Sequence, residues 1–314
     1  MLAKVEQKMM LSRFARSLFR RMPRAKRVLL RAHQAIFGER DEWRRQAHFW
    51  KYYADLYEWR WYEWRWRSVA AELWGEPIRP PPPNRFPPTE MRDAFTMDGR
   101  IPLGEQWADG TQPQNHPLIY TDAEVDACIA RIGRSETSIY SDTDKLLWVA
   151  LGRYPIMGKS VAVMGSISPW YEATCIHFGA RPTAIDYNPI ISKSSRLEAI
   201  TVAELHRSPR VFDCAVSISS FEHDGLGMYG DPLDPNGDLK AVKNMRRLVA
   251  PCGLLFLSIP VGRDALNFNV RRIYGRLRLP LMLRGWETVE TFGFQDDLLD
   301  IPYAVEPVFV LRNS

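Results

Sequence analysis

A glycine and an aspartate 21 residues apart each follow a short apolar segment. Gly165 follows the valine-rich run 160–164, and Asp186 follows the run 181–185. Runs of this kind suit strands that are buried on both faces. Glycine allows a sharp turn and a close approach of a ligand to the main chain. A carboxylate at the end of a strand can accept hydrogen bonds from two ribose hydroxyls. This pair predicts a nucleotide-ribose site.

The segment between the two residues predicts one helix. Pro169 can begin a helix, 170–178 continues it, and Gly179 ends it. The turn lacks the second and third glycines of a dinucleotide site, which argues against a pyrophosphate and so against a nicotinamide oxidoreductase. A cofactor without phosphate, such as S-adenosylmethionine, tolerates their loss. An ordinary strand–helix–strand unit with an exposed aspartate remains the alternative.

A second group of reactive residue types follows the predicted strand 212–219. Ser219 and Ser220 lead into Glu222, His223 and Asp224. Imidazole titrates near neutral pH, so His223 is a candidate general base, with Glu222 as its neighbour. A capping or core histidine is the alternative. Glu222 and His223 are too few ligands for a metal site, and we predict none.

The remaining pattern predicts alternating strands and helices. A capping-box sequence at 121–124 begins a helix, and 238–249 forms another that is broken at 251–253. The run 254–260 is a strongly apolar strand, and 286–292 with 308–311 could form a terminal strand pair. We therefore expect a doubly wound α/β fold with a mostly parallel, seven-stranded, Rossmann-like sheet.

These features resemble the class I S-adenosylmethionine-dependent methyltransferases over residues 140 to 314. The resemblance depends on the Gly165 turn, Asp186, the exit of the strand 212–219, and the approach 248–253 to the next strand. More narrowly, the chain resembles an uncharacterised methyltransferase-like family first described from nematode sequences. This resemblance depends on Gly165-Ser166 with Pro169-Trp170 and on the segments 222–232 and 260–265.

The resemblance implies roles for individual residues. Gly165 and Ser166 would face the methionine part of S-adenosylmethionine, and Asp186 its ribose. Ser219 and Ser220 would lie beneath the transferred methyl group. The catalytic candidates are His223, Glu222 and Asp224.

Two polar segments bear on the methyl acceptor, which is called the substrate below. The loop 222–238 is rich in Gly, Asp and Pro, and its Asp231 or Asp234 could bind sugar hydroxyls. A second cluster contains Arg263, Asp264, Asn269, Arg271, Arg272 and Tyr274. Solvated turns could account for the loop, but its position at the carboxyl end of a strand favours a substrate-facing role. A solvated helix face explains the second cluster equally well. We expect O-methylation of a small or glycan-like substrate. An inactive domain used for binding or membrane-associated assembly is the alternative function.

The N-terminal region differs from the rest of the chain. Residues 1–50 contain 13 Lys or Arg and 4 Asp or Glu, whereas the whole chain has a net charge of +5. Residues 2–22 predict a basic amphipathic helix for a membrane surface, a protein partner or a presequence. Residues 41–74 predict an aromatic-striped helix. We divide the chain into a helical N-terminal extension (1–76), a proline-rich linker and loop region (77–118), and the methyltransferase-like domain (119–314).

Composition excludes several classes of protein. The four cysteines show no paired spacing, which favours free thiols in a reducing compartment. No apolar run is long enough to span a bilayer, and residues 1–30 lack a secretory signal pattern. No recognition motif supports nucleic-acid binding. We expect a cytoplasmic protein with possible peripheral contact to a membrane through its N-terminus.

Overall fold

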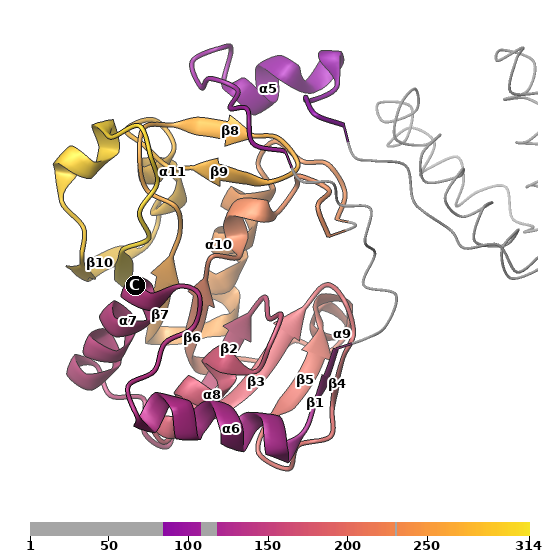
Figure 1. Cartoon of the computed structure of the whole chain (residues 1–314). Helices are drawn as coiled ribbons and strands as arrows, with labels where there is room; N and C mark the ends of the chain where they lie inside the picture. Colours follow the sequence, from indigo (N-terminus) through magenta and orange to yellow (C-terminus); the bar gives the residue numbers. More distant parts are fainter. Residues whose placement is uncertain (1–83, 108–117, 230) are drawn as a thin grey trace, which may run out of the picture. The chain divides into compact units, whose positions relative to one another are not determined.

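The computed structural model describes residues 84–107, 118–229 and 231–314 (Figure 1). The two helices predicted in the N-terminal extension and the run of four prolines at 80–83 lie outside the described residues. Within the described residues, no helix has the length and apolar character needed to cross a membrane.

A seven-stranded sheet forms the centre of the domain (Figure 1). In chain order its strands are β2 (Ser160–Met164), β3 (Arg181–Asp186), β5 (Glu198–Thr201), β6 (Phe212–Ile218), β7 (Val249–Ser258), β10 (Glu287–Phe292) and β11 (Val308–Arg312). Their spatial order is β10-β11-β7-β6-β2-β3-β5. Only β11 runs against its neighbours, so the sheet is mixed rather than purely parallel.

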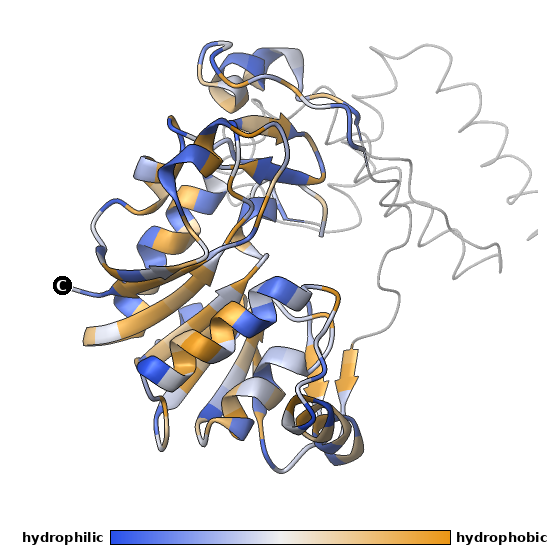
Figure 2. Ribbon diagram, turned by 60° about the vertical axis from the view of Figure 1, so that its left-hand side comes forward, coloured by the Kyte–Doolittle hydropathy of each residue, from blue (hydrophilic) through white to orange (hydrophobic). Residues whose placement is uncertain are grey.

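Both faces of the sheet are covered, which explains why its strands are apolar throughout. One face packs against α7 (Ser141–Arg153) and α8 (Trp170–His177). The other packs against α9 (Val202–Arg207), α10 (Gly237–Leu248) and α11 (Leu279–Met282). Alternate residues of one strand enter the two clusters, as Val161 and Ala162 do in β2. Figure 2 shows the apolar strands between the helices.

The chain reverses its direction of winding between β2 and β6. From β2 the next strands, β3 and β5, extend toward one edge, and β6 and β7 then extend toward the other. The two central strands are parallel, with Met164 paired to Ser217. Their carboxyl ends therefore meet at the point where ligands bind in open α/β sheets.

Most of the predicted central elements are confirmed. β2, α8, β3, β6, α10 and the terminal pair β10–β11 appear within about two residues of their predicted bounds. The predicted start of β7 at Leu254 is wrong, because this strand already begins at Val249. Cys252 has a left-handed backbone (φ 63°) and its N–H donates to the carbonyl of Asn313, so the Pro-Cys-Gly sequence bends the strand without ending it.

Smaller elements surround the sheet. α6 (Asp122–Gly133) begins with the predicted capping box between Thr121 and Glu124. A parallel pair joins β1 (Leu118–Tyr120) to β4 (Ile190–Ser192), and a hairpin joins β8 (Ala265–Asn267) to β9 (Arg271–Ile273). The 3-10 turns are η1 (Thr89–Met91), η2 (Phe221–His223) and η3 (Asp296–Asp300).

Part of the segment expected as loop packs on the β8–β9 hairpin. Residues 92–96 form the short helix α5, and the ring of Phe95 meets that of Phe268 edge to face at 5.3 Å. Further along, the N–H of Gly104 donates to the carbonyl of Leu266. A buried aromatic contact and a strand-like hydrogen bond therefore hold this segment against the domain.

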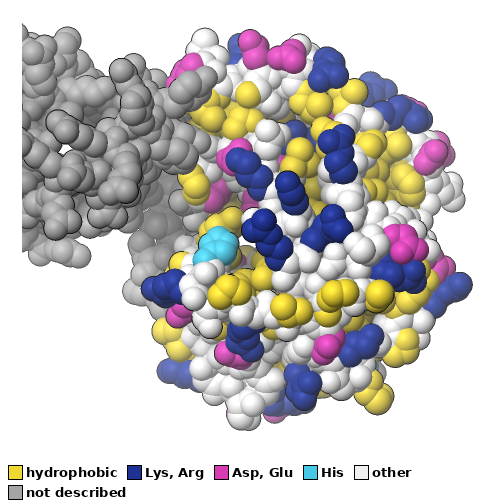
Figure 3. Space-filling model, turned by 180° about the vertical axis from the view of Figure 1, so that it is seen from behind, with side chains coloured by type: hydrophobic (Ala, Val, Ile, Leu, Met, Phe, Trp, Pro, Cys, Tyr) yellow, Lys and Arg dark blue, Asp and Glu magenta, His cyan; other side chains and the backbone are white. Residues whose placement is uncertain are grey.

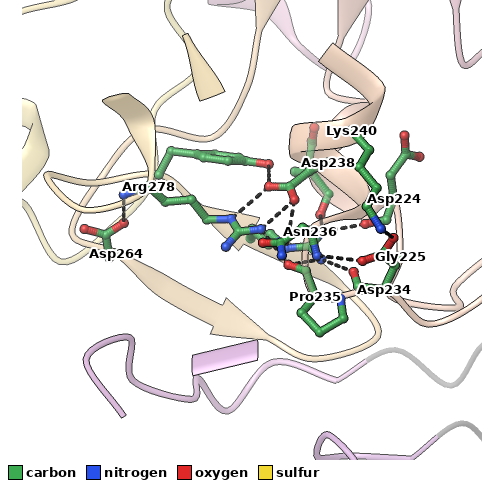
Figure 4. Close-up of polar contacts among 12 residues, drawn as sticks. Asp224, Gly225, Asp234, Pro235, Asn236, Asp238, Lys240, Asp264 and Arg278 are labelled. Carbon is green, nitrogen blue, oxygen red and sulfur yellow. Dashed lines mark hydrogen bonds and ion pairs between the residues drawn. The ribbon is translucent and has the colours of Figure 1, made fainter. Parts of the chain in front are cut away.

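A buried ionic network fixes the long loop between β6 and α10 (Figure 4). Arg278 donates to Asp238 at 2.8 Å, and the Tyr274 hydroxyl donates to the same carboxylate at 2.9 Å. Arg272 donates to the backbone carbonyls of Asp224 and Asp234, at the two ends of the loop. Burial alone would raise the pKa of Asp238, but the charges of Arg272 and Arg278 outweigh it and lower that pKa. The carboxylate therefore stays ionised inside the protein.

Replacing Asp238 with Asn tests this network. The change leaves Arg272 and Arg278 buried without their anionic partner, so we expect the free energy of unfolding to fall by about 3 kcal/mol. Chemical denaturation measures this difference. Asp234→Asn is the matched control, because Asp234 pairs with the solvent-exposed Lys240 and its loss should cost less than about 1 kcal/mol. Equal costs for the two variants would contradict the role given to Asp238.

Candidate functional site

A cavity of about 510 Å³ opens at the carboxyl ends of β2, β3 and β6. Its volume is typical of sites for small ligands. Its wall includes all but one of the cofactor-binding and catalytic residues predicted from the sequence: Gly165, Ser166, Asp186, Ser219, Ser220, His223 and Asp224. The exception is Glu222, which lies behind the wall.

Gly165 makes the turn after β2, and nothing larger fits there. Its backbone is left-handed (φ 68°), and a Cβ atom would lie 2.2 Å from the hydroxyl oxygen of Ser220. The turn after β2 and the exit of β6 are therefore in direct contact. This contact brings the predicted cofactor residues and the predicted catalytic residues to the two sides of one cavity.

Ile167 and Trp170 stand at the second and third glycine positions of the dinucleotide pattern, and both line the cavity. The side chain of Ser166 is buried and donates to the carboxyl group of Glu172 in α8. Trp170 is also buried and packs with Tyr120 and Val125 against α6. The turn and the helix that follows it are thus held by a serine–carboxyl contact and by a buried tryptophan, and the tryptophan stands where a dinucleotide site has its third glycine.

The contact with Ser166 places a carboxyl group, that of Glu172, inside the protein. Glu172 is fully buried, and this burial raises the pKa of its carboxyl group to about 7. Its Oε2 atom has no hydrogen-bond partner among the described residues. No pattern in the sequence points to a buried Glu172, because a glutamate in a short helix is usually exposed.

Asp186 lies where the sequence predicted it, at the carboxyl end of β3. Its two oxygens accept hydrogen bonds from the backbone N–H groups of Ser166 (3.3 Å) and Asn188 (2.7 Å). These contacts fix the orientation of the carboxylate at the cavity wall. Each oxygen keeps a second lone pair, so the group can still accept hydrogen bonds from a ligand. Burial raises the pKa of Asp186, which such donors would counteract.

His223 lies on the opposite wall, in η2. Its Nδ1 atom contacts the backbone carbonyl of Val270, and only a protonated nitrogen can donate to a carbonyl. The neutral ring therefore carries its hydrogen on Nδ1 and leaves a lone pair on Nε2. Burial lowers the pKa of His223, so the imidazole is neutral at neutral pH. These are the properties that a general base requires.

Glu222 and Asp224, the neighbours of His223, differ in their access to the cavity. Glu222 has 0% exposure and accepts a hydrogen bond from Ser219 at 2.6 Å. Burial raises its pKa to about 7. Because it is buried behind Ser219, the structure gives no support to direct contact between Glu222 and a substrate. Asp224 does line the cavity, and burial raises its pKa as well.

The residues expected to bind a glycan form hydrogen bonds and ion pairs with other groups of the protein. Asp231 accepts hydrogen bonds from three backbone N–H groups, those of Gly225, Gly227 and Tyr229, which folds the loop onto itself. Asp234 pairs with Lys240. In the second cluster, the side chain of Asp264 accepts three backbone hydrogen bonds and Arg272 is in the buried network. These polar residues hold the loops in place, so the sugar-binding roles expected for Asp231 and Asp234 lose their support.

The structure also adds residues that the sequence analysis missed. Tyr140, ahead of α7, and Tyr187, directly after Asp186, line the cavity. Glu306, just before β11, lies beside Ser219. Of these, only Tyr187 had a sequence signal, its position next to Asp186. No pattern could place Tyr140 and Glu306, because their neighbours in space are about 80 residues away in the chain.

The far end of the cavity lies between α9 and α10. Leu205 and Met245 form its apolar wall, and His206 and Arg247 line it as well. Exposed Lys and Arg side chains gather on the face that carries these helices (Figure 3). Arg247 thus places a positive charge in the wall near this end, and Asp224 places a carboxyl group in another part of the wall. Within the described residues, no group of three or more His, Cys, Asp or Glu side chains could hold a metal ion.

Residues 158–301 match the model of the family described as "Caenorhabditis protein of unknown function, DUF268". The match confirms the resemblance inferred from the sequence. The matched residues run from the end of the segment before β2 to η3 and so include most of the mixed seven-stranded α/β sheet. No curated protein matches the chain.

Two solved structures illustrate the likeness. One is 1,6-didemethyltoxoflavin-N1-methyltransferase from Burkholderia thailandensis, with 1,6-didemethyltoxoflavin and S-adenosylhomocysteine bound. It is 17% identical over 67% of this chain and 93% of that chain, with a TM-score of 0.42. The other is the N-methyltransferase NodS from Bradyrhizobium japonicum WM9 in complex with S-adenosylhomocysteine. It is 17% identical over 61% of this chain and 97% of that chain, with a TM-score of 0.39.

Replacing Gly165 with Ala tests the contact between the two halves of the site. The collision with Ser220 and the left-handed backbone should together lower the free energy of unfolding by about 2–4 kcal/mol. Gly158→Ala is the matched control, because Gly158 is also left-handed but has open space around its Cβ position. It should cost only about 1 kcal/mol. Adding Ser220→Gly to the Gly165→Ala variant removes the collision. The double variant should therefore recover the part of the free energy of unfolding that the collision costs. No recovery in that double variant would show that the collision is not the cause.

Proposed function

We propose that this chain is an S-adenosylmethionine-dependent methyltransferase that acts on a small-molecule substrate. The single observation that carries the proposal is the position of Asp186 and His223 on opposite walls of one cavity, across the contact between Gly165 and Ser220. The cofactor supplies an electrophilic methyl group, and the chain supplies a ribose anchor on one side and a base on the other.

The residues of the cavity fit the cofactor. Asp186 is oriented by two backbone donors and keeps free lone pairs, as a ribose anchor requires. Tyr187 presents an aromatic ring beside it, and Leu205 and Met245 line an apolar region that suits a purine base. The turn at Gly165 lacks the second and third glycines that a pyrophosphate needs, and S-adenosylmethionine contains no pyrophosphate. Both solved structures named above contain S-adenosylhomocysteine.

The chain's own contribution to the reaction is orientation and proton removal. Ser219, Tyr140 and Asp224 surround the end of the cavity where His223 lies. They provide hydroxyl and carboxyl groups that can orient a substrate. Nε2 of His223 can take the proton that the substrate loses when its heteroatom receives a methyl group. A hydroxyl, amine or thiol would each satisfy this requirement, so oxygen is one of three candidate atoms.

Replacing Asp186 with Asn tests the cofactor site. The variant keeps the shape of the side chain and loses its charge, so S-adenosylhomocysteine should bind more weakly by about 1.5–3 kcal/mol, the scale of a lost charge-assisted hydrogen bond. Titration calorimetry measures this affinity, with NAD titrated in parallel. Asp142→Asn, an exposed carboxylate in α7, is the control and should leave the affinity unchanged. Equal affinity in the Asp186 variant, or tighter binding of NAD, would argue against the assignment.

Replacing His223 with Gln tests the base. Methyl transfer from tritium-labelled S-adenosylmethionine to a low-molecular-mass cell extract should slow by about 100-fold, the lower range for general-base catalysis. The affinity for S-adenosylhomocysteine should stay the same, because His223 lies on the substrate side. His177→Gln, an exposed histidine of α8 that is not part of the cavity wall, is the matched control and should keep the rate. A fast His223 variant would rule out this histidine as the base.

A further inference from the structure

Four large apolar side chains in the cavity wall are exposed to solvent. They are Ile139 (83% exposed), Ile167 (65%), Tyr187 (51%) and Tyr229 (40%). Ile139 is the most exposed large apolar side chain in the part of the chain that the structure describes. Single apolar side chains scattered over a surface are ordinary, but several around one cavity mark a binding site. The wall thus offers apolar surface that a ligand would cover.

Two of these side chains lie at the end of the cavity that holds the proposed base. The ring of Tyr229 meets that of His223 edge to face, with ring centroids 5.5 Å apart. Ile139 directly precedes Tyr140, which reaches Ser219. Burial raises the pKa of Tyr140, and a hydrogen bond between Tyr140 and Ser219 partly offsets this effect. Apolar surface therefore lies beside the position from which His223 would remove a proton.

Several polar groups at this end of the cavity are already paired within the protein. Ser219 donates its hydroxyl hydrogen to Glu222 at 2.6 Å, and Nδ1 of His223 contacts the carbonyl of Val270. The groups that remain for a ligand include Nε2 of His223 and the carboxyl group of Asp224. A sugar has several hydroxyl groups, and each one that is buried without a partner is costly. A ligand with an apolar body and few polar atoms fits this wall better.

The proposed base is weak, which limits the protons that it can remove. Burial lowers the pKa of His223 below that of an ordinary histidine. An aromatic hydroxyl such as that of tyrosine ionises with a pKa of about 10, whereas the aliphatic hydroxyl of serine or of a sugar is far less acidic. General-base catalysis is most effective when the base and the proton donor are closely matched. An aromatic hydroxyl is therefore the better match for this imidazole.

We propose that the substrate is a small aromatic molecule with a ring hydroxyl group, and that its ring lies against Tyr229 and Ile139. The proposal rests on the methyl-transfer function above and names its substrate class. The hydroxyl oxygen forms a bond to the methyl carbon of S-adenosylmethionine, the bond from that carbon to sulfur breaks, and its electron pair stays on sulfur. The hydroxyl proton passes to Nε2 of His223. The side chain of His223 is 15% exposed, so the imidazolium can return this proton to water.

The test uses 2-naphthol, which has two fused aromatic rings, one hydroxyl group and its own fluorescence. It is titrated into the protein saturated with S-adenosylhomocysteine, so that the cofactor side of the cavity is occupied. Methyl glucoside is titrated in the same way by calorimetry. We expect 2-naphthol to bind and methyl glucoside to show no binding at the same concentrations.

Two variants of the wall locate the bound ring. Tyr229→Ala and Ile139→Ser should each weaken the binding of 2-naphthol by about five-fold or more, the scale of one lost aromatic or apolar contact. Tyr303→Ala and Met157→Ser are the matched controls, because these side chains are 63% and 78% exposed and lie outside the cavity wall. The controls should leave the affinity unchanged.

The product of the labelled-extract assay gives a second measurement. Label transferred from tritium-labelled S-adenosylmethionine should move into ethyl acetate, because methylation of an aromatic hydroxyl yields an apolar ether. A methylated sugar would stay in the water phase, and label found only there would overturn the proposal.

Three binding results would also overturn it. The first is binding of methyl glucoside as tight as that of 2-naphthol, and the second is an unchanged affinity for 2-naphthol in both wall variants. The third is a change of oligomeric state in Ile139→Ser without a change in affinity, because the exposed wall would then be a contact between proteins. Titration of S-adenosylhomocysteine alone separates the two hypotheses. Its failure to bind refutes the methyl-transfer function, whereas binding of S-adenosylhomocysteine without 2-naphthol refutes only the substrate class.

Discussion

The site depends on the contact between Gly165 and Ser220. Parallel strands place the carboxyl ends of β2 and β6 side by side, but only a residue without a Cβ atom lets the two chain segments touch. This contact sets the distance between the wall with Asp186 and the wall with His223. The three-glycine pattern is a solution for binding a pyrophosphate, whereas this chain needs a single glycine for a contact within the protein.

The buried network around Asp238 serves the same site from the other side. Arg272 bonds to backbone carbonyls at both ends of the loop that follows His223, and Asp238 balances its charge. A loop rich in glycine and aspartate would lose much conformational entropy on folding. The arginines and the Asp231 hydrogen bonds offset this loss and hold the described parts of the loop beside His223. The polar residues that suggested a glycan site are thus ones that hold the loop next to the proposed base.

The sequence predicted the half of the site that depends on local pattern. Gly165, Asp186 and His223 each follow an apolar strand, and the carboxyl ends of parallel strands meet at one edge. The sequence analysis missed β5 and the helix α9 that follows it. The capping box of Thr201 and Glu204 at the start of α9 is of the same kind as the one recognised at Thr121. The sequence could not reveal Glu306, because β11 enters the sheet between β10 and β7 and brings a residue 87 positions away to Ser219. A contact that forms because a distant strand enters the sheet leaves no pattern in the sequence near either residue.

Buried carboxyl groups lie on both sides of the central turn, and each has a hydroxyl partner. Ser166 donates to Glu172 on the cofactor side, and Ser219 donates to Glu222 on the substrate side. Burial raises both pKa values above that of an unfolded chain, so each group favours folding when protonated and opposes it once pH rises through neutrality. A chain under selection for stability alone would replace such groups with apolar residues. Glu172 is explained by its contact with the turn, whereas Glu222 and Glu306 each have a buried oxygen that no contact among the described residues uses, so stability alone does not account for them.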